Sequence, residues 1–179
     1  MDDYTMSLDP ETEMSCTLYL FKDVQNSDEI RKKVMSGELS CSIIKAAIIV
    51  DPLQIIVAAN KAAINAKTNR LTTKSLYTEV LFNLSISKNI LRALTEFGIH
   101  DNDKNILVVL IHKEHEKLMS KIIKDSIKGE KIPISRLAEF KDLELIEKMY
   151  KIEKDELNIS TLTNSVVSRI SCKDFISIK

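Results

Sequence analysis

A chain of 179 residues with 44% hydrophobic and 29% charged residues has the size and composition of one soluble globular domain. Its 26 basic and 26 acidic residues cancel, which excludes a protein that coats nucleic acid with its whole surface. We expect one domain over 1–179, with less ordered ends at 1–15 and 175–179. The acidic start and the lack of a long apolar run predict no secretory signal and no membrane span, and hence a cytoplasmic and nuclear protein.

Strand and helix signals are interspersed along the chain. Runs of β-branched and aromatic residues predict strands, and apolar residues at helical spacing between capping residues and glycines predict helices. In chain order the predictions are a strand over 16–24, a helix over 27–36, a strand or buried extended segment over 43–50, helices over 51–67, 75–84 and 87–98 (with Ser87 as its cap), a buried strand over 106–111, and helices over 113–128, 134–140, 142–151 and 156–171. We therefore expect an α/β fold in which several helices cover one small mixed sheet.

The helix predicted over 51–67 carries few polar side chains. Asp51 can cap it, Pro52 suits its first position, and one side is mostly alanine. Its polar residues form a narrow line: Gln54, Asn60, Lys61 and Asn65. The helix otherwise has the pattern of a buried element, so this line needs partners elsewhere in the fold or in a ligand.

Charge is distributed unevenly along the chain. Residues 1–51 hold ten acids and five bases, whereas residues 52–95 hold one acid and six bases. The segment 52–78 contains no acid and four bases: Lys61, Lys67, Arg70 and Lys74. Lysine and arginine neutralise phosphates while neutral donors position them, so this segment is the candidate contact with a polyanion. A solvated patch on a neutral protein is the alternative.

The sequence contains no constellation typical of an enzyme. The three glycines are isolated, so no glycine-rich loop can hold a nucleotide phosphate. His112 and His115 have helical spacing but no evident third ligand, so a solvated turn is expected and no metal site. The cysteines, Cys16, Cys41 and Cys172, are far apart and are expected to be reduced structural thiols. We expect no catalytic residue and no cofactor.

The C-terminal segment 155–171 carries an apolar stripe. The stripe consists of Ile159, Leu162, Val166 and Ile170, with Val167 beside it. Such a stripe either packs on the core of its own chain or docks in a groove of a partner. The residues alone leave both interpretations open.

Five segments match one known family in order and spacing. They are CTLYLFKDVQN, AIIVDPLQIIVAANKA, SLYTEVLFNLSISKNILRALTEFGI, KNILVVLI and TLTNSVVSRISCKDF, which together span roughly residues 16–175. In these segments the chain resembles TPRKB-like proteins, the kinase-binding subunit of the KEOPS (EKC) complex. The resemblance implies a non-catalytic α/β domain that binds the small atypical kinase/ATPase of KEOPS and, through it, the other subunits. It also implies a supporting role in threonylcarbamoyladenosine modification of tRNAs that read ANN codons.

The resemblance further implies binding of tRNA, notably its 3′ CCA end. It points first to Lys61 and next to Asn60, both in the VAANKA match; the candidates Lys67, Arg70 and Lys74 rest on charge. We assign kinase docking to Leu162, Val166, Val167 and Ile170. One alternative is a purely structural adaptor or regulator of the kinase without direct tRNA binding, and another is an enzyme with its own substrate.

Two positions depart from the family pattern. TPRKB-like proteins often carry a proline where this chain has Lys45–Ala46, and a glycine in the connector where it has Asn69. Asparagine can adopt the left-handed conformation that a glycine would supply, so the same fold is expected.

Overall fold

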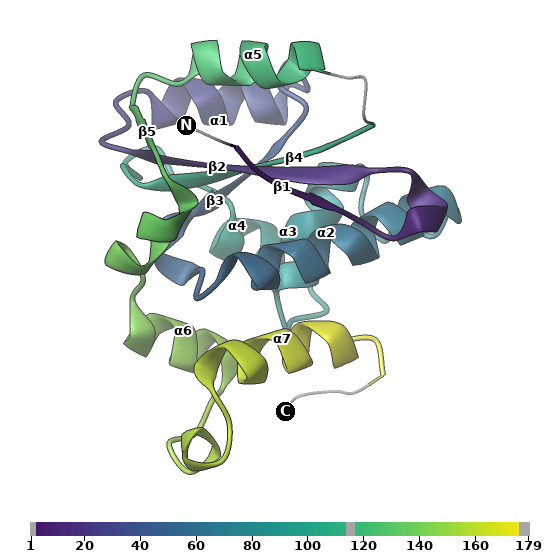
Figure 1. The fold of residues 1–179 in the computed structure, drawn as a ribbon, viewed down its shortest axis with the longest axis vertical. Coiled ribbons are helices and arrows are strands. Elements are labelled where there is room, and N and C mark those ends of the chain that lie inside the picture. Colours follow the sequence, from purple (N-terminus) through teal and green to yellow (C-terminus); the bar gives the residue numbers. More distant parts are fainter. Residues whose placement is uncertain (1–2, 114–116, 176–179) are drawn as a thin grey trace.

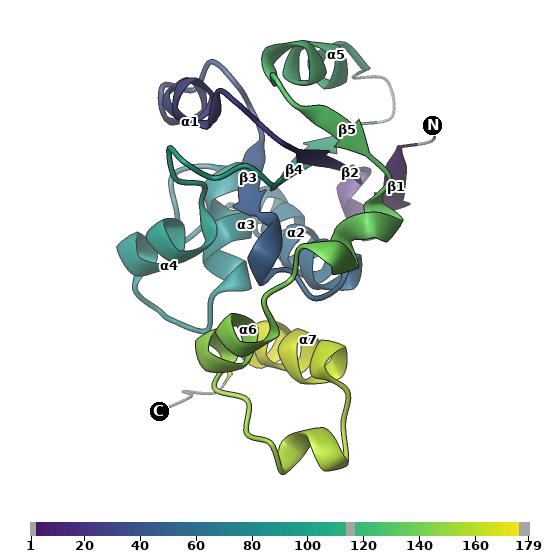
Figure 2. The ribbon, with the colours of Figure 1, turned by 90° about the vertical axis from the view of Figure 1, so that its left-hand side faces the viewer.

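The computed structural model describes residues 3–113 and 117–175 and contains four layers of secondary structure, seen in Figures 1 and 2. The strands are β1 (Tyr4–Ser7), β2 (Ser15–Lys22), β3 (Ser42–Lys45), β4 (Ile106–His112) and β5 (Glu130–Ile132). The α-helices are α1 (Ser27–Met35), α2 (Pro52–Lys67), α3 (Leu76–Leu84), α4 (Ile90–Phe97), α5 (Lys117–Ser126), α6 (Leu143–Tyr150) and α7 (Leu162–Cys172). None of these helices is long and apolar enough to span a bilayer.

One sheet organises the domain. Its order is β1-β2-β4-β3, and β5 pairs with β2 beyond the end of β1, so that β1 and β5 share one edge. Each of these pairings is antiparallel. The expected α/β fold with one small sheet is confirmed, although the described strands pair only antiparallel rather than in a mixed sheet. The apolar run over 106–111 forms β4, which is buried on both faces.

Helices cover the two faces of the sheet unequally (Figure 1). Alternate residues of β2 and β4 enter two separate cores. On one face Tyr19 and Val108 pack with Ile30 of α1 and Ile123 of α5. The opposite face packs against α2, beyond which α6 and α7 form the fourth layer. The helix α2 is therefore covered on two sides.

The alanines of α2 form its most deeply buried surface. Ala58, Ala59, Ala62 and Ala63 are fully buried, and α2 contacts both α3 and α7. Small side chains let helix backbones approach closely, which explains why alanines occupy these contacts. The larger residues Leu53 and Ile64 instead keep 42% and 36% of their surface exposed.

Most predicted elements are confirmed, and α4 and α7 start later than predicted. The structure begins α4 at Ile90, where the Asn89 side chain accepts a hydrogen bond from the Arg92 N–H at 2.9 Å, so Asn89 and not Ser87 is the cap. Ser87 does not cap α4 because its hydroxyl accepts the Asn89 N–H, at 3.1 Å, in the turn before the helix.

The predicted helix over 156–171 is wrong at its start. Residues Glu156–Asn158 form a 3-10 turn, and α7 begins at Leu162 because the Thr161 side chain caps it. Ile159 therefore lies outside the helix and is almost fully exposed, rather than part of the stripe. The predicted helix over 134–140 is likewise a 3-10 turn at Ile134–Glu139.

Both ends of α2 have the conformations that the sequence predicts. Asp51 caps α2 by accepting the Leu53 N–H at 2.8 Å. Asn69 follows the end of α2 with a φ of 54°, the left-handed conformation expected of it. Residues 4–12 also belong to the fold, since β1 pairs with β2 and a 3-10 turn at Pro10–Thr12 contacts α2.

Close packing of the α2 alanines predicts a size limit at these positions. Replacing Ala62→Leu should lower the free energy of unfolding by about 1–3 kcal/mol, because the added carbons have no space. Guanidinium unfolding followed by circular dichroism measures this change. The matched control is Ala66→Leu at a half-buried position of the same helix, which should cost much less; equal stability of the two variants would contradict the packing argument.

Candidate functional site

The polar line on α2 is bonded to other parts of the chain. Lys61, the first candidate for tRNA contact, donates from Nζ to the Ile170 carbonyl at 2.9 Å and forms an ion pair with Asp174 at the same distance. Its side chain keeps 18% of its surface exposed. Because carbonyls at a helix C-terminus carry partial negative charge, Lys61 stabilises the end of α7. Its charge is therefore largely compensated within the chain.

The other members of the line have internal partners as well. Asn60 accepts the Asp9 N–H at 2.7 Å and so fixes the turn after β1. Gln54 is fully buried, accepts the Val50 N–H at 2.9 Å and donates to the Tyr150 hydroxyl at 2.9 Å. The polar line thus connects α2 to its neighbours, and its residues are structural in this fold.

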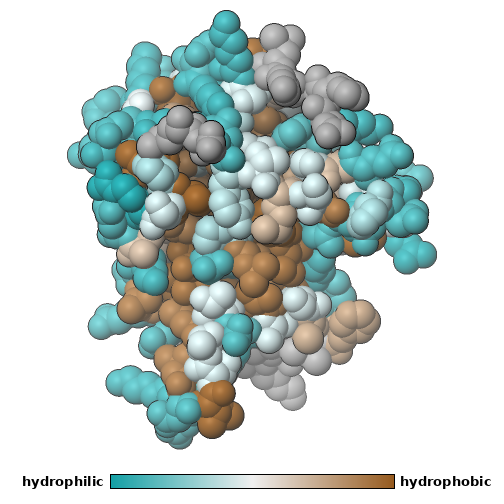
Figure 3. Space-filling model, in the orientation of Figure 1, coloured by the Kyte–Doolittle hydropathy of each residue, from teal (hydrophilic) through white to brown (hydrophobic). Residues whose placement is uncertain are grey.

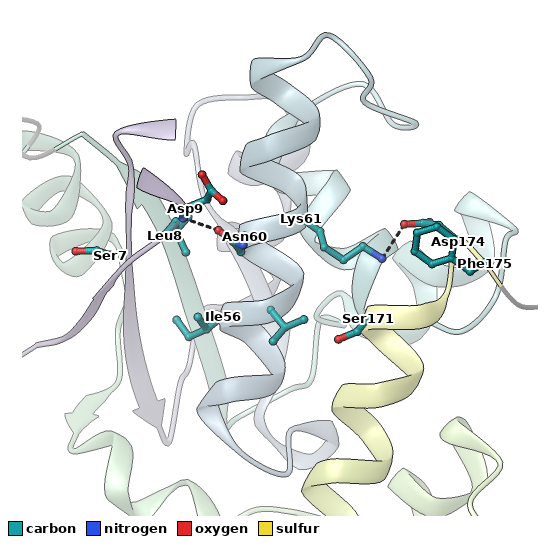
Figure 4. A pocket seen from close by; sticks show the side chains of 10 residues that line it. Ser7, Leu8, Asp9, Ile56, Asn60, Lys61, Ser171, Asp174 and Phe175 are labelled. Carbon is teal, nitrogen blue, oxygen red and sulfur yellow. Dashed lines mark hydrogen bonds and ion pairs between the residues drawn. The ribbon is translucent and has the colours of Figure 1, made fainter. Parts of the chain in front are cut away.

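Asn60 and Lys61 also line a cavity of about 450 Å³ between α2, the end of α7 and the turn after β1 (Figure 4). Its floor is apolar and includes Val57, and Phe175 stands exposed at its margin. Its remaining charged residues are Asp9 and Asp174. With two carboxylates and one paired lysine, this cavity does not favour a phosphate.

The three remaining basic candidates lie in or beside the connector between α2 and α3, and they differ in their environments. The Lys67 ammonium donates to the backbone carbonyl of Glu11 and also to the Glu11 carboxylate, the second bond being 3.3 Å long. Arg70 is exposed, and no ion pair of its side chain occurs within the part of the chain described here. Lys74 is exposed and lines a different cavity, between α1 and α4. The structure therefore does not bring the five candidates into one surface.

A buried carboxylate holds the connector in place. Glu79 of α3 accepts the N–H groups of Thr72 and Thr73, the Thr73 hydroxyl at 2.8 Å, and the Asn65 amide at 3.2 Å. A carboxylate so bonded is costly to displace. Glu79 therefore fixes the path of the segment that carries Arg70. The sequence indicated this role only in that Glu79 is the single acid between residues 52 and 95.

Two of the four residues assigned to kinase docking are buried in the chain itself. Val166 and Ile170 are fully buried in the core between α2 and α7, so they are not surface groups in this structure. The reason is that α7, in the fourth layer, packs on α2 with the centre of its stripe. Leu162 and Val167 are half-buried, and their assignment to docking stays a prediction.

An exposed apolar surface remains beside that core. We call it the α2–α7 face and define it as Leu53, Val57 and Ile64 of α2 with Leu162 and Val167 of α7. In Figure 3 hydrophobic residues gather across the middle of the molecule, over α2. An apolar surface of this kind on a folded chain indicates a contact with another protein.

A second lysine supports the same end of α7. Lys173 is buried, donates to the Phe82 carbonyl of α3, and lies over the Phe82 ring at 3.3 Å from its centroid. Burial first, and the positive charge of Lys61 second, lower the pKa of Lys173 from 10.5 to about 8. Lys61 and Lys173 thus tie the C-terminus of α7 to α2 and α3, respectively.

The cysteines and histidines have structural environments. Cys16 and Cys41 are buried free thiols, and burial raises the pKa of each to about 12; Cys172 is exposed. His112 contacts the Thr17 hydroxyl at 2.8 Å, while His115 lies outside the described residues. Within residues 3–113 and 117–175, no three His, Cys, Asp or Glu side chains are grouped to hold a metal.

Comparison with known proteins gives consistent similarities. The profile of the family "Kinase binding protein CGI-121" matches residues 21–174. The chain is 39% identical over 170 residues to EKC/KEOPS complex subunit TPRKB of Danio rerio, covering 95% of this chain and 97% of that protein. It is 28% identical over 148 residues to EKC/KEOPS complex subunit CGI121 of Yarrowia lipolytica, covering 80% and 83%. The Coccidioides immitis protein of that name is 30% identical over 139 residues, covering 74% and 67%.

The buried ammonium of Lys173 predicts a pH dependence of stability. With a pKa near 8 when folded and 10.5 when unfolded, the unfolded chain binds more protons between these values, so stability should rise with pH across this window. Below pH 8 Lys173 is protonated in both the folded and the unfolded chain, and burying its charge then lowers the free energy of unfolding by the full amount, about 3 kcal/mol. The free energies of unfolding of the parent protein and of Lys173→Met, measured with denaturant, should therefore differ by an amount that changes between pH 8 and 10.5.

The control for this measurement is Lys154→Met, at an exposed position, whose difference from the parent should stay constant with pH. A constant difference for Lys173→Met as well would contradict the lowered pKa.

Proposed function

Because this chain belongs to the family of kinase binding protein CGI-121, we propose that it is a non-catalytic subunit of a KEOPS complex. Its direct partner is the small atypical kinase/ATPase of that complex. Its role is to support threonylcarbamoyladenosine modification of tRNAs that read ANN codons. The observation that carries this proposal is the similarity to KEOPS subunits over 95% of the chain, together with an exposed apolar face.

The α2–α7 face is the surface that we assign to the kinase. Leu53 and Ile64 are exposed on a rigid helix whose opposite side is fully packed, so presenting them costs little conformational entropy. Leu162 and Val167 continue this apolar surface on α7, which is why they stay in the assignment although Val166 and Ile170 do not. Apolar side chains at the centre of an interface supply most of its binding energy.

Replacing Leu53→Glu should weaken kinase binding about tenfold or more, because a charge would be buried in the interface. The measurement is titration of the purified kinase by calorimetry. The matched control is Ile122→Glu, which is also 42% exposed but lies on α5, across the sheet. If both variants bind as the parent does, the kinase contacts another surface.

For tRNA we propose a contact through the connector around Arg70. The side chain of Arg70 is exposed on a segment held by Glu79, and the hydroxyl of the neighbouring exposed Thr72 can donate to a phosphate. Lys67 lies nearby in sequence, with its charge partly used by Glu11. Lys61 and Asn60 contribute indirectly, by fixing α7 and the turn after β1.

Replacing Arg70→Glu should weaken binding of tRNA several-fold and reduce its dependence on salt concentration, because a phosphate contact is lost. Filter binding over a range of salt, with tRNA carrying or lacking its CCA end, measures both effects. Lys121→Glu on α5 is the control for the same change of charge. Binding that is unaffected by Arg70→Glu rules out the connector, and binding that ignores the CCA end rules out recognition of that end.

One observation favours a second candidate function, an adaptor of the kinase without direct tRNA contact. Lys61 and Lys67 each pair with an acid of this chain, which leaves little free positive charge between residues 52 and 70. Full kinase binding combined with no measurable binding of tRNA would favour this adaptor over the first proposal.

A further inference from the structure

A second cavity, larger than the one beside Lys61, lies away from the α2–α7 face. It has a volume of about 630 Å³ and is bordered by α1, the segment leading into β3, α3 and α4; in Figure 2 α1 lies above β3, and α3 and α4 lie below it. We call it the α1–α4 groove. Its lining includes the aliphatic residues Leu39, Ile43, Leu81, Leu94 and Ile99. Its size is that of sites that hold a small ligand or several side chains of a partner.

Two large apolar side chains stand exposed at the groove. Met35 at the end of α1 and Leu91 in the first turn of α4 each keep 75% of their surface exposed, and both line the groove. They come from different elements and meet at one cavity. A small ligand within the groove would leave such residues uncovered, whereas a protein segment lying across it would bury them.

The charged residues of the groove have one sign. Arg31 and Lys74 line it together with His100, and neither Asp nor Glu is among its lining residues. Arg31 forms an exposed ion pair with Asp101 at 3.0 Å, which leaves Lys74 as the cation available to a partner. A carboxylate on the partner would therefore find a complementary charge beside an apolar surface.

RNA is the less suitable occupant. Unpaired bases bind by stacking on accessible aromatic rings. The aromatic residue that lines the groove is Tyr77, whose hydroxyl donates to the Ile111 carbonyl of β4 at 3.1 Å and so holds the ring toward the sheet. Aliphatic side chains of a polypeptide suit this lining better.

We propose that the α1–α4 groove binds an amphipathic segment of another protein, in which apolar anchors fill the groove and neighbouring acidic residues face Lys74. The anchors would cover Met35 and Leu91. This mode is that of an apolar peptide face docking in a groove. The site is separate from the α2–α7 face, so the chain can hold this partner and the kinase at the same time.

The test begins with a random peptide library displayed on phage and selected on the full chain. Enriched peptides should combine aliphatic or aromatic residues with Asp or Glu. Fluorescence anisotropy should then show about tenfold weaker binding of such a peptide to Leu91→Ser, and several-fold weaker binding to Lys74→Glu. Ile122→Ser and Lys121→Glu are the matched controls, and both should bind as the parent does.

Three results would overturn the proposal. The first is that the selected peptides are basic. The second is that their affinity does not change in Leu91→Ser. The third is that an RNA oligonucleotide ending in CCA, or dodecanoate, displaces a selected peptide. Displacement by the RNA would assign the groove to the tRNA end, and displacement by dodecanoate would assign it to a small amphiphile. Kinase affinity of Leu91→Ser is measured in parallel and should be unchanged, so failure here is distinct from failure of kinase binding.

Discussion

The close packing of α2 is the constraint on which the rest of this structure depends. Its alanines lie against neighbouring elements on the buried side, where any larger residue would push the layers apart. This contact fixes how far α3 and α7 stand from the sheet. Because the alanines occupy the core, the larger Leu53 and Ile64 remain on the surface of a helix that cannot rotate to bury them. The same packing therefore builds the core and presents an apolar face to a partner.

Buried polar contacts supplement this packing at the edges of the helical layers. Gln54 connects α2 to Tyr150 of α6, and Glu79 gathers the connector between α2 and α3. Lys61 and Lys173 secure the end of α7 to two different helices. Removing one partner from such a pair leaves a buried group without its hydrogen bonds, so these contacts specify a single arrangement of the layers.

Much of the fold could be predicted from sequence because its signals are local. Asp51 and Pro52 mark the start of α2, the apolar run over 106–111 marks the central strand β4, and Asn69 marks a left-handed residue. The errors arose where nearby capping residues compete, as with Ser87 and Asn89 before α4. The short strands β1 and β5 had no detectable pattern, since pairing with β2 defines them.

The sequence by itself determined most of the elements, the absence of nucleotide-binding loops and, through its resemblance to TPRKB-like proteins, the family. Only the tertiary structure decided which side chains are available. Lys61 reads as a free cation in the sequence, yet Asp174, far along the chain, compensates its charge. From the sequence, Val166 suits a core or an interface equally well; the structure shows that it is buried where α7 packs on α2. The physical reason is that charge compensation and burial depend on residues distant in sequence, whereas capping and periodicity depend on neighbours.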